Sequence, residues 1–277
     1  MSASPDEAPP SSGDIDARER SSPEELLELA VTVARAAGAL LLDRFQSGRE
    51  RALESKSTPT DLVSEADLTS ERLIRDTLAR TRPRDGFLGE EGGGEKGSTG
   101  LTWVVDPLDG TVNFLFSIPQ WCVSVAVRDE SGVLAGAILD PCRDELFTAT
   151  RDGPALLNGG PLAASDCADL SRAMLATGFA YDASVRAAQA EVLARLLPRV
   201  RDIRRFGSAA LDLAWTAAAR YDAYFERTVK PWDIAAGTLV CERSGLAVLE
   251  LPERAGLPSG VLAAVPTLSG ELFQLVT

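Results

Sequence analysis

The residues with the clearest capacity for chemistry lie in the stretch 101–114, which reads LTWVVDPLDGTVNF. An apolar run typical of a buried strand ends at Asp106, and Asp109 follows across Pro107. Across a tight turn, the two carboxylates can point into one small volume, where they repel each other unless a proton or cation lies between them. The stretch therefore indicates a cation site, with a surface turn rich in Asp, Pro and Gly as the alternative.

The next residues add a second feature to this stretch. Gly110 turns the chain, and Thr111 is predicted to begin a short helix. Backbone amides at the start of a helix bind phosphate oxygens well. A cation site beside a phosphate site suggests metal-assisted phosphate chemistry.

Composition excludes several other kinds of site. The chain has no histidine, which excludes Ser-His-Asp hydrolysis and the usual zinc sites, so any metal must be held by oxygen. Oxygen ligands favour Mg²⁺, Mn²⁺ or Ca²⁺. The net charge of −13, from 41 acidic and 28 basic residues, argues against nonspecific nucleic-acid binding and suits a site that gathers cations.

The length of 277 residues and the 45% hydrophobic content predict a globular protein with a large core. No apolar run approaches the ~20 residues of a membrane span, and the first twenty residues do not resemble a signal peptide. Cys122 and Cys241 lie in apolar segments and are predicted to be core residues rather than disulfide partners. These features favour a cytoplasmic protein without a membrane partner.

Three parts are predicted along the chain. Residues 1–21 are polar and proline-rich, which is typical of a disordered tail. Residues 22–155 form an α+β lobe, with helices at 23–45 and from 67, a loop or hairpin at 47–61, and a meander of strands at 121–127, 133–139 and 145–149. Residues 156–277 form an α/β lobe with helices at 184–197, 208–220 and 233–243, between strands at 203–206 and 223–226 and near 248 and 262.

Further acids stand where they could reach the central stretch. Glu90 lies among glycines that let a backbone approach a ligand closely, although a solvated loop reads the same way. Asp67 and Asp233 each stand at the expected start of a helix, where capping alone could explain them.

Taken together, these residues resemble the inositol monophosphatase family of lithium-sensitive, magnesium-dependent phosphatases. The resemblance spans residues 24–265 in family order. It rests on three motifs: Gly89-Glu90-Glu91, Asp106-Pro107-Leu108-Asp109-Gly110-Thr111 with Asn113-Phe114, and Trp232-Asp233 with Ala235-Ala236-Gly237. There are two supporting matches: Lys56-Ser57 through Asp61 with Asp67, and Gly207-Ser208-Ala209-Ala210 with Glu226. The resemblance implies a layered αβαβα sandwich.

The resemblance also implies a metal site. Glu90, Asp106 and the Leu108 carbonyl would bind one Mg²⁺, and Asp106 would bridge to a second ion held by Asp109 and Asp233. Glu90 would also touch a third, weaker ion. Mn²⁺ is a possible substitute, and lithium inhibition would follow from Li⁺ replacing one Mg²⁺.

Roles in catalysis follow from the same resemblance. Gly110 and Thr111 would bind phosphate through their amides, and the Thr111 hydroxyl, oriented by Asp67, would hold the attacking water. The remaining implied residues would bind the hydroxyls of the substrate: Asp109, Ser208, Ala209 and Glu226. Phe116 and Lys230-Pro231 depart from the commonest family pattern around the mouth of the site, which puts the choice of substrate in doubt.

The expected function is Mg²⁺-dependent hydrolysis of inositol 1-phosphate or a similar small polyol phosphate, by a homodimer. The same site could instead act on histidinol phosphate, fructose 1,6-bisphosphate or 3′-phosphoadenosine 5′-phosphate. An alternative of another class is a regulatory or binding protein of this family, although the retention of all four metal acids weighs against it.

Overall fold

A computed structural model describes residues 21–48, 52–55, 62–254 and 256–277. Except for its last position, the predicted disordered tail lies outside the described residues. So does much of the loop or hairpin predicted at 47–61. The short strand β1 (Ala52–Ser55) lies within that range and pairs antiparallel with β2 (Leu62–Ser64), which directly follows it.

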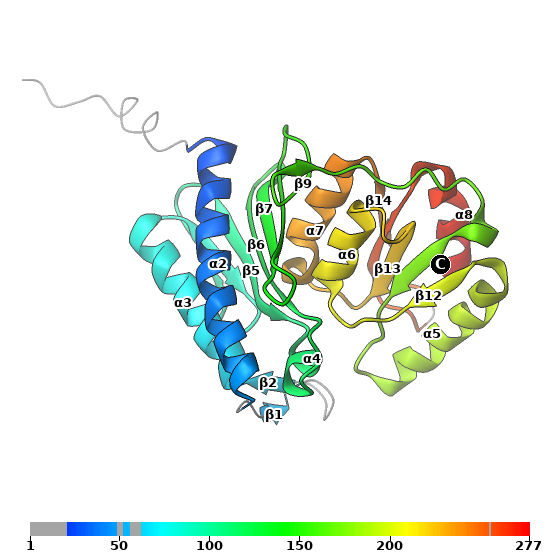
Figure 1. The fold of residues 1–277 in the computed structure, drawn as a ribbon, viewed down its shortest axis with the longest axis horizontal. Helices are drawn as coiled ribbons and strands as arrows, with labels where there is room; N and C mark the ends of the chain where they lie inside the picture. The colour runs from blue at the N-terminus through cyan, green and yellow to red at the C-terminus, as the bar shows by residue number, and fades with distance from the viewer. Residues whose placement is uncertain (1–20, 49–51, 56–61, 255) are drawn as a thin grey trace, which may run out of the picture.

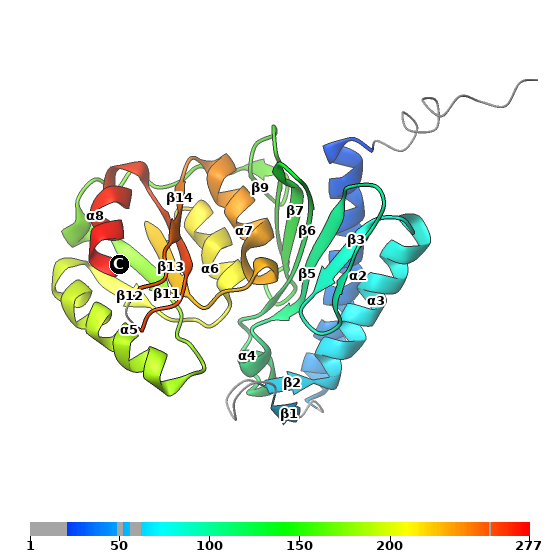
Figure 2. The same ribbon diagram turned by 180° about the vertical axis from the view of Figure 1, so that it is seen from behind.

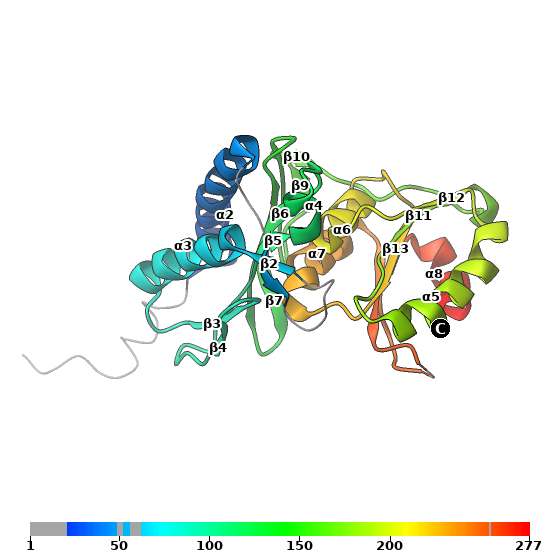
Figure 3. The same ribbon diagram turned by 90° about the horizontal axis from the view of Figure 1, so that it is seen from below.

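Five layers make up the molecule (Figure 1). Helices α2 and α3 cover the outer face of an eight-stranded sheet, α6 and α7 lie between this sheet and a five-stranded one, and α5 and α8 cover the far side. The same order is visible from behind in Figure 2 and from below in Figure 3. The predicted αβαβα sandwich is confirmed.

The outer layer forms for reasons that are readable in the sequence. Helix α2 (Pro23–Ser47) begins with a capping box between Ser22 and Glu25, and its buried face, which includes Leu26, Val33 and Leu41, recurs at helical spacing. Helix α3 (Glu65–Thr81) packs beside it. Both helices and one face of the large sheet share a single apolar core.

The eight-stranded sheet has the order β10-β9-β8-β7-β6-β5-β3-β4 and is antiparallel except where β3 runs parallel to β5. The predicted meander is its centre, since β5 to β8 pair in sequence order. Its strands are β3 (Gly86–Gly89), β4 (Gly93–Glu95), β5 (Thr102–Asp109), β6 (Cys122–Asp129), β7 (Gly132–Asp140), β8 (Glu145–Thr150), β9 (Leu156–Leu157) and β10 (Gly160–Pro161).

Helices α6 (Ala209–Ala217) and α7 (Pro231–Ser244) fill the space between the sheets. They approach each other closely because Gly237 leaves room for Leu213, whose side chain would lie 2.6 Å from a Cβ at that position. Helix α7 also lies directly against the first sheet, since a Cβ at Gly136 of β7 would meet Ala236 Cα at 3.0 Å. These contacts fix α7 between the layers.

The five-stranded sheet has the order β12-β11-β13-β15-β14, with β11, β12 and β13 parallel and the last two strands antiparallel to their neighbours. Helix α8 was not predicted from the sequence. The elements of this part are β11 (Met174–Thr177), α5 (Ala183–Leu196), β12 (Asp202–Arg204), β13 (Ala223–Arg227), β14 (Ala247–Leu251), β15 (Gly260–Ala264), α8 (Pro266–Val276) and the 3₁₀ turns Leu170–Arg172 and Leu197–Arg199.

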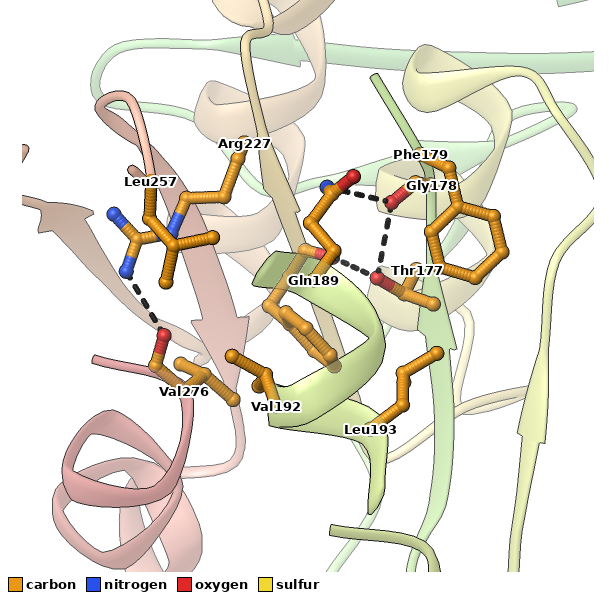
Figure 4. Close-up of a pocket in the computed structure, with 10 residues that line it drawn as sticks. Thr177, Gly178, Phe179, Gln189, Val192, Leu193, Arg227, Leu257 and Val276 are labelled. Carbon is orange, nitrogen blue, oxygen red and sulfur yellow. Dashed lines mark hydrogen bonds between the residues drawn. The ribbon is translucent and has the colours of Figure 1, made fainter. Parts of the chain in front are cut away.

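A buried arginine ties the end of the chain to this sheet (Figure 4). The guanidinium of Arg227, on β13, donates to the carbonyls of Pro252 at 2.7 Å, Pro258 at 2.9 Å and Val276 at 2.8 Å. These carbonyls come from the β14–β15 connection and from α8, so Arg227 joins three segments. A small cavity of about 10 Å³ lies beside it, lined by Thr177, Gln189 and other residues.

Two expectations about the class of protein can be checked in the described ranges. No helix there is both long and apolar enough to cross a membrane. All four cysteines are free, and Cys122 and Cys241 are fully buried, which confirms their predicted place in the core.

Candidate active site

Strand β5 carries the two central acids to the edge of a cavity. Asp106 faces Ser124 of β6 and Asp109 faces Cys122, so the two strands advance by three and by two residues between these pairs. Pro107 lies in this irregular step and has no N–H to donate to the neighbouring strand. The step brings both carboxyl groups to the same cavity, and both are more than 90% buried.

The turn after β5 depends on a glycine. Gly110 has φ 102°, and a Cβ there would lie 2.9 Å from the carbonyl oxygen of Gln120. Helix α4 (Thr111–Leu115) follows, as predicted, but it forms little more than one turn. A helix this short has a small dipole, so any phosphate binding here rests on the individual amides rather than on the field of the helix.

Thr111 and Asp67 form a buried pair below this turn. Thr111 Oγ1 lies 2.8 Å from Asp67 Oδ1 and 3.1 Å from the Leu108 carbonyl oxygen, and its single proton is directed to the closer, acidic acceptor. The other oxygen of Asp67 accepts from the amide and the hydroxyl of Ser64 at 2.8 and 2.6 Å. Burial raises the pKa of Asp67, and these hydrogen bonds oppose the rise.

The predicted helix start at Asp67 is wrong by three residues. Ser64 is the N-cap of α3, and Asp67 is the third residue of the helix, where its side chain completes a capping box. The same correction applies to Asp233: Lys230 is the N-cap of α7, and Asp233 Oδ2 accepts from the Lys230 amide at 2.6 Å. Each acid therefore supports its helix from inside the first turn.

Asp109 is held by the start of helix α6. Its Oδ2 accepts from the Ser208 hydroxyl and from the Ala210 amide, both at 2.7 Å, at the start of α6. Ser208 is buried, and its hydroxyl is directed to Asp109 rather than into the cavity, whereas Ala209 lines the cavity. This contact links the central stretch to α6 across about a hundred residues of sequence.

Glu90 follows β3, which runs parallel to β5, and its amide donates to the Val105 carbonyl at 3.3 Å. The parallel pairing brings Glu90 beside the end of β5. Gly89 lets the chain pass close to Glu71: a Cβ there would overlap the Glu71 carboxylate, which accepts from the Glu91 amide at 2.8 Å.

The four acids proposed as metal ligands line one cavity of about 590 Å³, together with Leu108, Gly110 and Thr111. Burial, followed by the negative charges of its neighbours, raises the pKa of Asp106 well above its ordinary value. The pKa of Asp233 is raised well above its ordinary value by the same causes, and burial raises the pKa of Asp109 to about 6. Mutual repulsion of this kind is relieved by a cation.

The donor set fits Mg²⁺ or Mn²⁺, since it consists of carboxylate and carbonyl oxygens without nitrogen or sulfur. Cys122, whose thiol lies 3.8 Å from Asp109, is buried, and burial raises its pKa well above the ordinary value, so it stays a thiol. No three acidic or cysteine side chains in the described ranges form a ready-made ligand cluster. The acids surround a shared space.

The far wall of the cavity comes from the second sheet. Glu226 of β13 lines it, and burial raises the pKa of Glu226 to about 7. Sequence reasoning missed Arg205, which lines the same wall and whose charge lowers the pKa of Glu226, and Tyr224, whose hydroxyl donates to Glu226 Oε2 at 2.7 Å. The alternation of side chains along a strand could have indicated Tyr224, since residues 224 and 226 share a face.

Comparisons with known proteins agree with this geometry. The model of the inositol monophosphatase family matches residues 22–274. An inositol-1-monophosphatase of Mycobacterium leprae is 45% identical over 234 residues, which cover 80% of each chain. An Escherichia coli K12 protein named Nus factor SuhB is 40% identical over 222 residues, which cover 79% of this chain and 83% of its own.

A solved structure shares the fold. The crystal structure of the extragenic suppressor protein suhB of Bartonella henselae superposes with a TM-score of 0.84 at 33% identity, covering 91% of this chain and 98% of its own. Sequence and fold agree over nearly the whole described chain, and the family match includes every acid of the cavity. The chain therefore belongs to the inositol monophosphatase family.

Proposed function

We propose that the protein is a Mg²⁺-dependent phosphomonoesterase that hydrolyses inositol 1-phosphate or a similar small polyol phosphate. The observation that carries the proposal is the meeting of Glu90, Asp106, Asp109 and Asp233 in one cavity, beside a threonine whose hydroxyl is already oriented. These acids come from separate segments, and crowding four carboxyl groups around one space, with Asp106 and Asp109 buried, is costly unless protons or cations offset their charge.

In this proposal, Glu90, Asp106, Asp109, Asp233 and the Leu108 carbonyl hold two or three Mg²⁺ ions, with Mn²⁺ as a substitute. When bound, the ions supply Lewis-acid polarisation of the phosphate and offset charge on the attacking and leaving oxygens.

The residues of the chain orient the reactants. Asp67 accepts the proton of the Thr111 hydroxyl, which leaves the lone pairs of Thr111 Oγ1 to accept a hydrogen from the attacking water. The amides of Gly110 and Thr111 donate to phosphate oxygens, and Gly110 permits the close backbone approach that this needs. No covalent intermediate with the protein is required.

Hydroxyl groups of the substrate are bound on the opposite wall. Glu226 is an acceptor for adjacent hydroxyls, and the Ala209 backbone and the carboxyl group of Asp109, which line the same cavity, would also contact the substrate. Ser208 contributes by fixing Asp109.

A substrate panel tests the proposal. Phosphate release is measured for inositol 1-phosphate, histidinol phosphate, fructose 1,6-bisphosphate and 3′-phosphoadenosine 5′-phosphate, with Mg²⁺, with Mn²⁺ and with a chelator. We expect the largest kcat/KM for inositol 1-phosphate and no turnover with the chelator. Faster turnover of histidinol phosphate would contradict the substrate, and turnover in the chelator would contradict the metal requirement.

A regulatory role is the second candidate, and it is favoured by the similarity to an Escherichia coli protein whose name is that of a Nus factor. Affinity capture from cells of the source organism with the wild-type protein and with Asp106→Asn separates the two. A stoichiometric protein complex retained by the inactive variant would support the regulatory role, and its absence would favour the enzyme alone.

The homodimer implied by the family resemblance is also proposed. Sedimentation equilibrium should give twice the chain mass of 29.4 kDa, and a single-chain mass at micromolar concentration would contradict it.

A further inference from the structure

The side chain of Glu226 is fixed from two directions, and the first is Tyr224. Residues two apart on a strand point to the same face, and Tyr224 donates its hydroxyl to Glu226 Oε2 at 2.7 Å. Tyr224 is completely buried, whereas Glu226 is partly exposed to the cavity. A bond to one carboxylate oxygen leaves Oε1 to accept hydrogen bonds from a ligand.

The second direction is the backbone at Gly178. A Cβ at this position would overlap the Glu226 carboxyl group, so the carboxyl group lies directly against the main chain. The backbone there is itself held, because the buried Gln189 donates to the Gly178 carbonyl at 3.3 Å (Figure 4). Glu226 therefore has little freedom to rotate away from the cavity.

The direction of the hydrogen bond follows from the surroundings. Burial raises the pKa of Tyr224 well above its ordinary value, so the phenol stays protonated and must donate. Neither oxygen of the neighbouring buried Asp212 has a hydrogen-bond partner within the described part of the chain, so Asp212 does not compete for this proton. Glu226 is the acceptor, and above pH 7, where its carboxyl group is mostly ionised, the hydrogen bond is of the stronger, charge-assisted kind.

We propose that Tyr224 is the positioning residue of the substrate wall: it holds Glu226 Oε2 so that Oε1 receives the hydroxyls of a polyol phosphate. The inference rests on the proposed function. Tyr224 does not touch the substrate, and its role is expressed only through Glu226. It therefore concerns the binding of the polyol part, and hydrolysis of a phosphate ester without hydroxyl groups does not depend on it.

The test compares inositol 1-phosphate with 4-nitrophenyl phosphate, whose alcohol part has no further hydroxyl. For Tyr224→Phe we expect KM for inositol 1-phosphate to rise about 10-fold, the effect of one hydrogen bond to a charged group, with kcat within about 2-fold. Both constants for 4-nitrophenyl phosphate should stay unchanged. Tyr221→Phe is the matched control: Tyr221 is also buried, but its hydroxyl has no partner among the described residues.

A double-mutant cycle shows whether Tyr224 acts through Glu226. In a Glu226→Ala background, Tyr224→Phe should change KM for inositol 1-phosphate by less than about 2-fold, since nothing remains to be positioned. Gly178→Ala, which displaces Glu226 by another route, should raise the same KM and spare 4-nitrophenyl phosphate.

The outcomes separate the inference from the proposed function. An equal loss of kcat/KM on both substrates in Tyr224→Phe would show a merely structural role. An unchanged KM for inositol 1-phosphate would also overturn the inference. The phosphatase proposal would stand in both cases. A wild-type protein that hydrolyses 4-nitrophenyl phosphate but no polyol phosphate would overturn the substrate proposal and this inference together.

Discussion

Two cavities of the molecule bury charge in opposite ways. The small cavity of Figure 4, about 10 Å³, lies beside Arg227, whose guanidinium donates to three backbone carbonyls. The large cavity, about 590 Å³, is lined by acids whose neighbours are mostly other acids. The first leaves room for roughly a single water and is internally satisfied. In the second, acids raise one another's pKa although Arg205 and Lys230 line the same cavity, and in the proposed function bound cations offset this repulsion.

The difference separates groups that stabilise the fold from groups that serve a ligand. Buried polar groups in a protein normally have partners, and a cluster of acids whose pKa values are raised by burial and by one another marks a candidate site. No motif surrounds Arg227, so the sequence does not predict its role, whereas the spacing of the acids indicates a site. We therefore expect substitutions in the two cavities to affect different properties of the protein.

Asp106→Asn should have the largest effect. It removes the acid that faces three others, and we expect kcat to fall by about 10³-fold or more, since the proposed ions lose the ligand that they share. Stability without metal should be unchanged or increased, because a repelled charge is removed. Circular dichroism and phosphate release measure both, and Asp129→Asn, at a surface ion pair with Arg151, is the control. A loss of only a few-fold would contradict the metal assignment.

Arg227→Met should show the reverse pattern. Three carbonyls lose their donor, one buried at Val276 and two partly buried at Pro252 and Pro258, and we expect the free energy of unfolding to fall by about 3 kcal/mol. Denaturant unfolding measures this, and Mg²⁺ affinity should stay within about 2-fold of wild type. Arg199→Ala, in an exposed pair with Glu271, should cost less than about 1 kcal/mol. Weaker Mg²⁺ binding by Arg227→Met would contradict the view that one cavity serves stability and the other serves ligand binding.

Asp67→Ala should reduce kcat about 10- to 100-fold, because Thr111 loses the acceptor that orients its hydroxyl. The same variant loses its half of the capping box of α3, so stability should also fall by about 1 kcal/mol. Asp67→Asn restores an acceptor oxygen and should recover part of the rate. Full activity in Asp67→Ala would leave Asp67 with its role in the helix alone.

The smallest expected effect is the change in stability per pH unit that Glu226 causes. The folded protein raises the pKa of Glu226 from 4.5 to about 7, so folding favours its protonated form. In chelator, the contribution of this group is greatest below pH 4.5 and is lost as the pH rises to 7, by at most about 1.4 kcal/mol per pH unit. Thermal unfolding at pH 5, 6 and 7 measures the slope, and Glu226→Gln should reduce it. An equal slope in that variant would place its origin elsewhere.

Much of the fold could be predicted because local signals and burial agree. Ser22-Pro23 fixed the start of α2, Gly245 marked the end of α7, and the alternating meander gave the centre of the large sheet. Helix α8 was missed although its sequence carries local signals, with Pro266 in the first turn and the buried residues Leu268, Leu272 and Val276 at a spacing of four.

The residues of the site also fall into those that the sequence predicts and those that it does not. The acids and Thr111 were identified from motifs, and the cavity brings these positions together. Tyr224 and Arg227 were not identified, since each acts through a partner that is distant or unremarkable in sequence. The helix starts at Asp67 and Asp233 were misplaced because an acid at the third position of a helix and one at its cap look alike in sequence.

The close seating of α7 has a consequence for how this chain can vary. Asp233 occupies one end of a helix that touches Gly136 on one side and, through Gly237, Leu213 on the other. A methyl group added at either glycine would displace α7 and move Asp233 relative to Asp106, although no polar atom had changed. The position of Asp233 in the proposed site therefore depends on two glycines at apolar helix contacts, which themselves carry no reactive group.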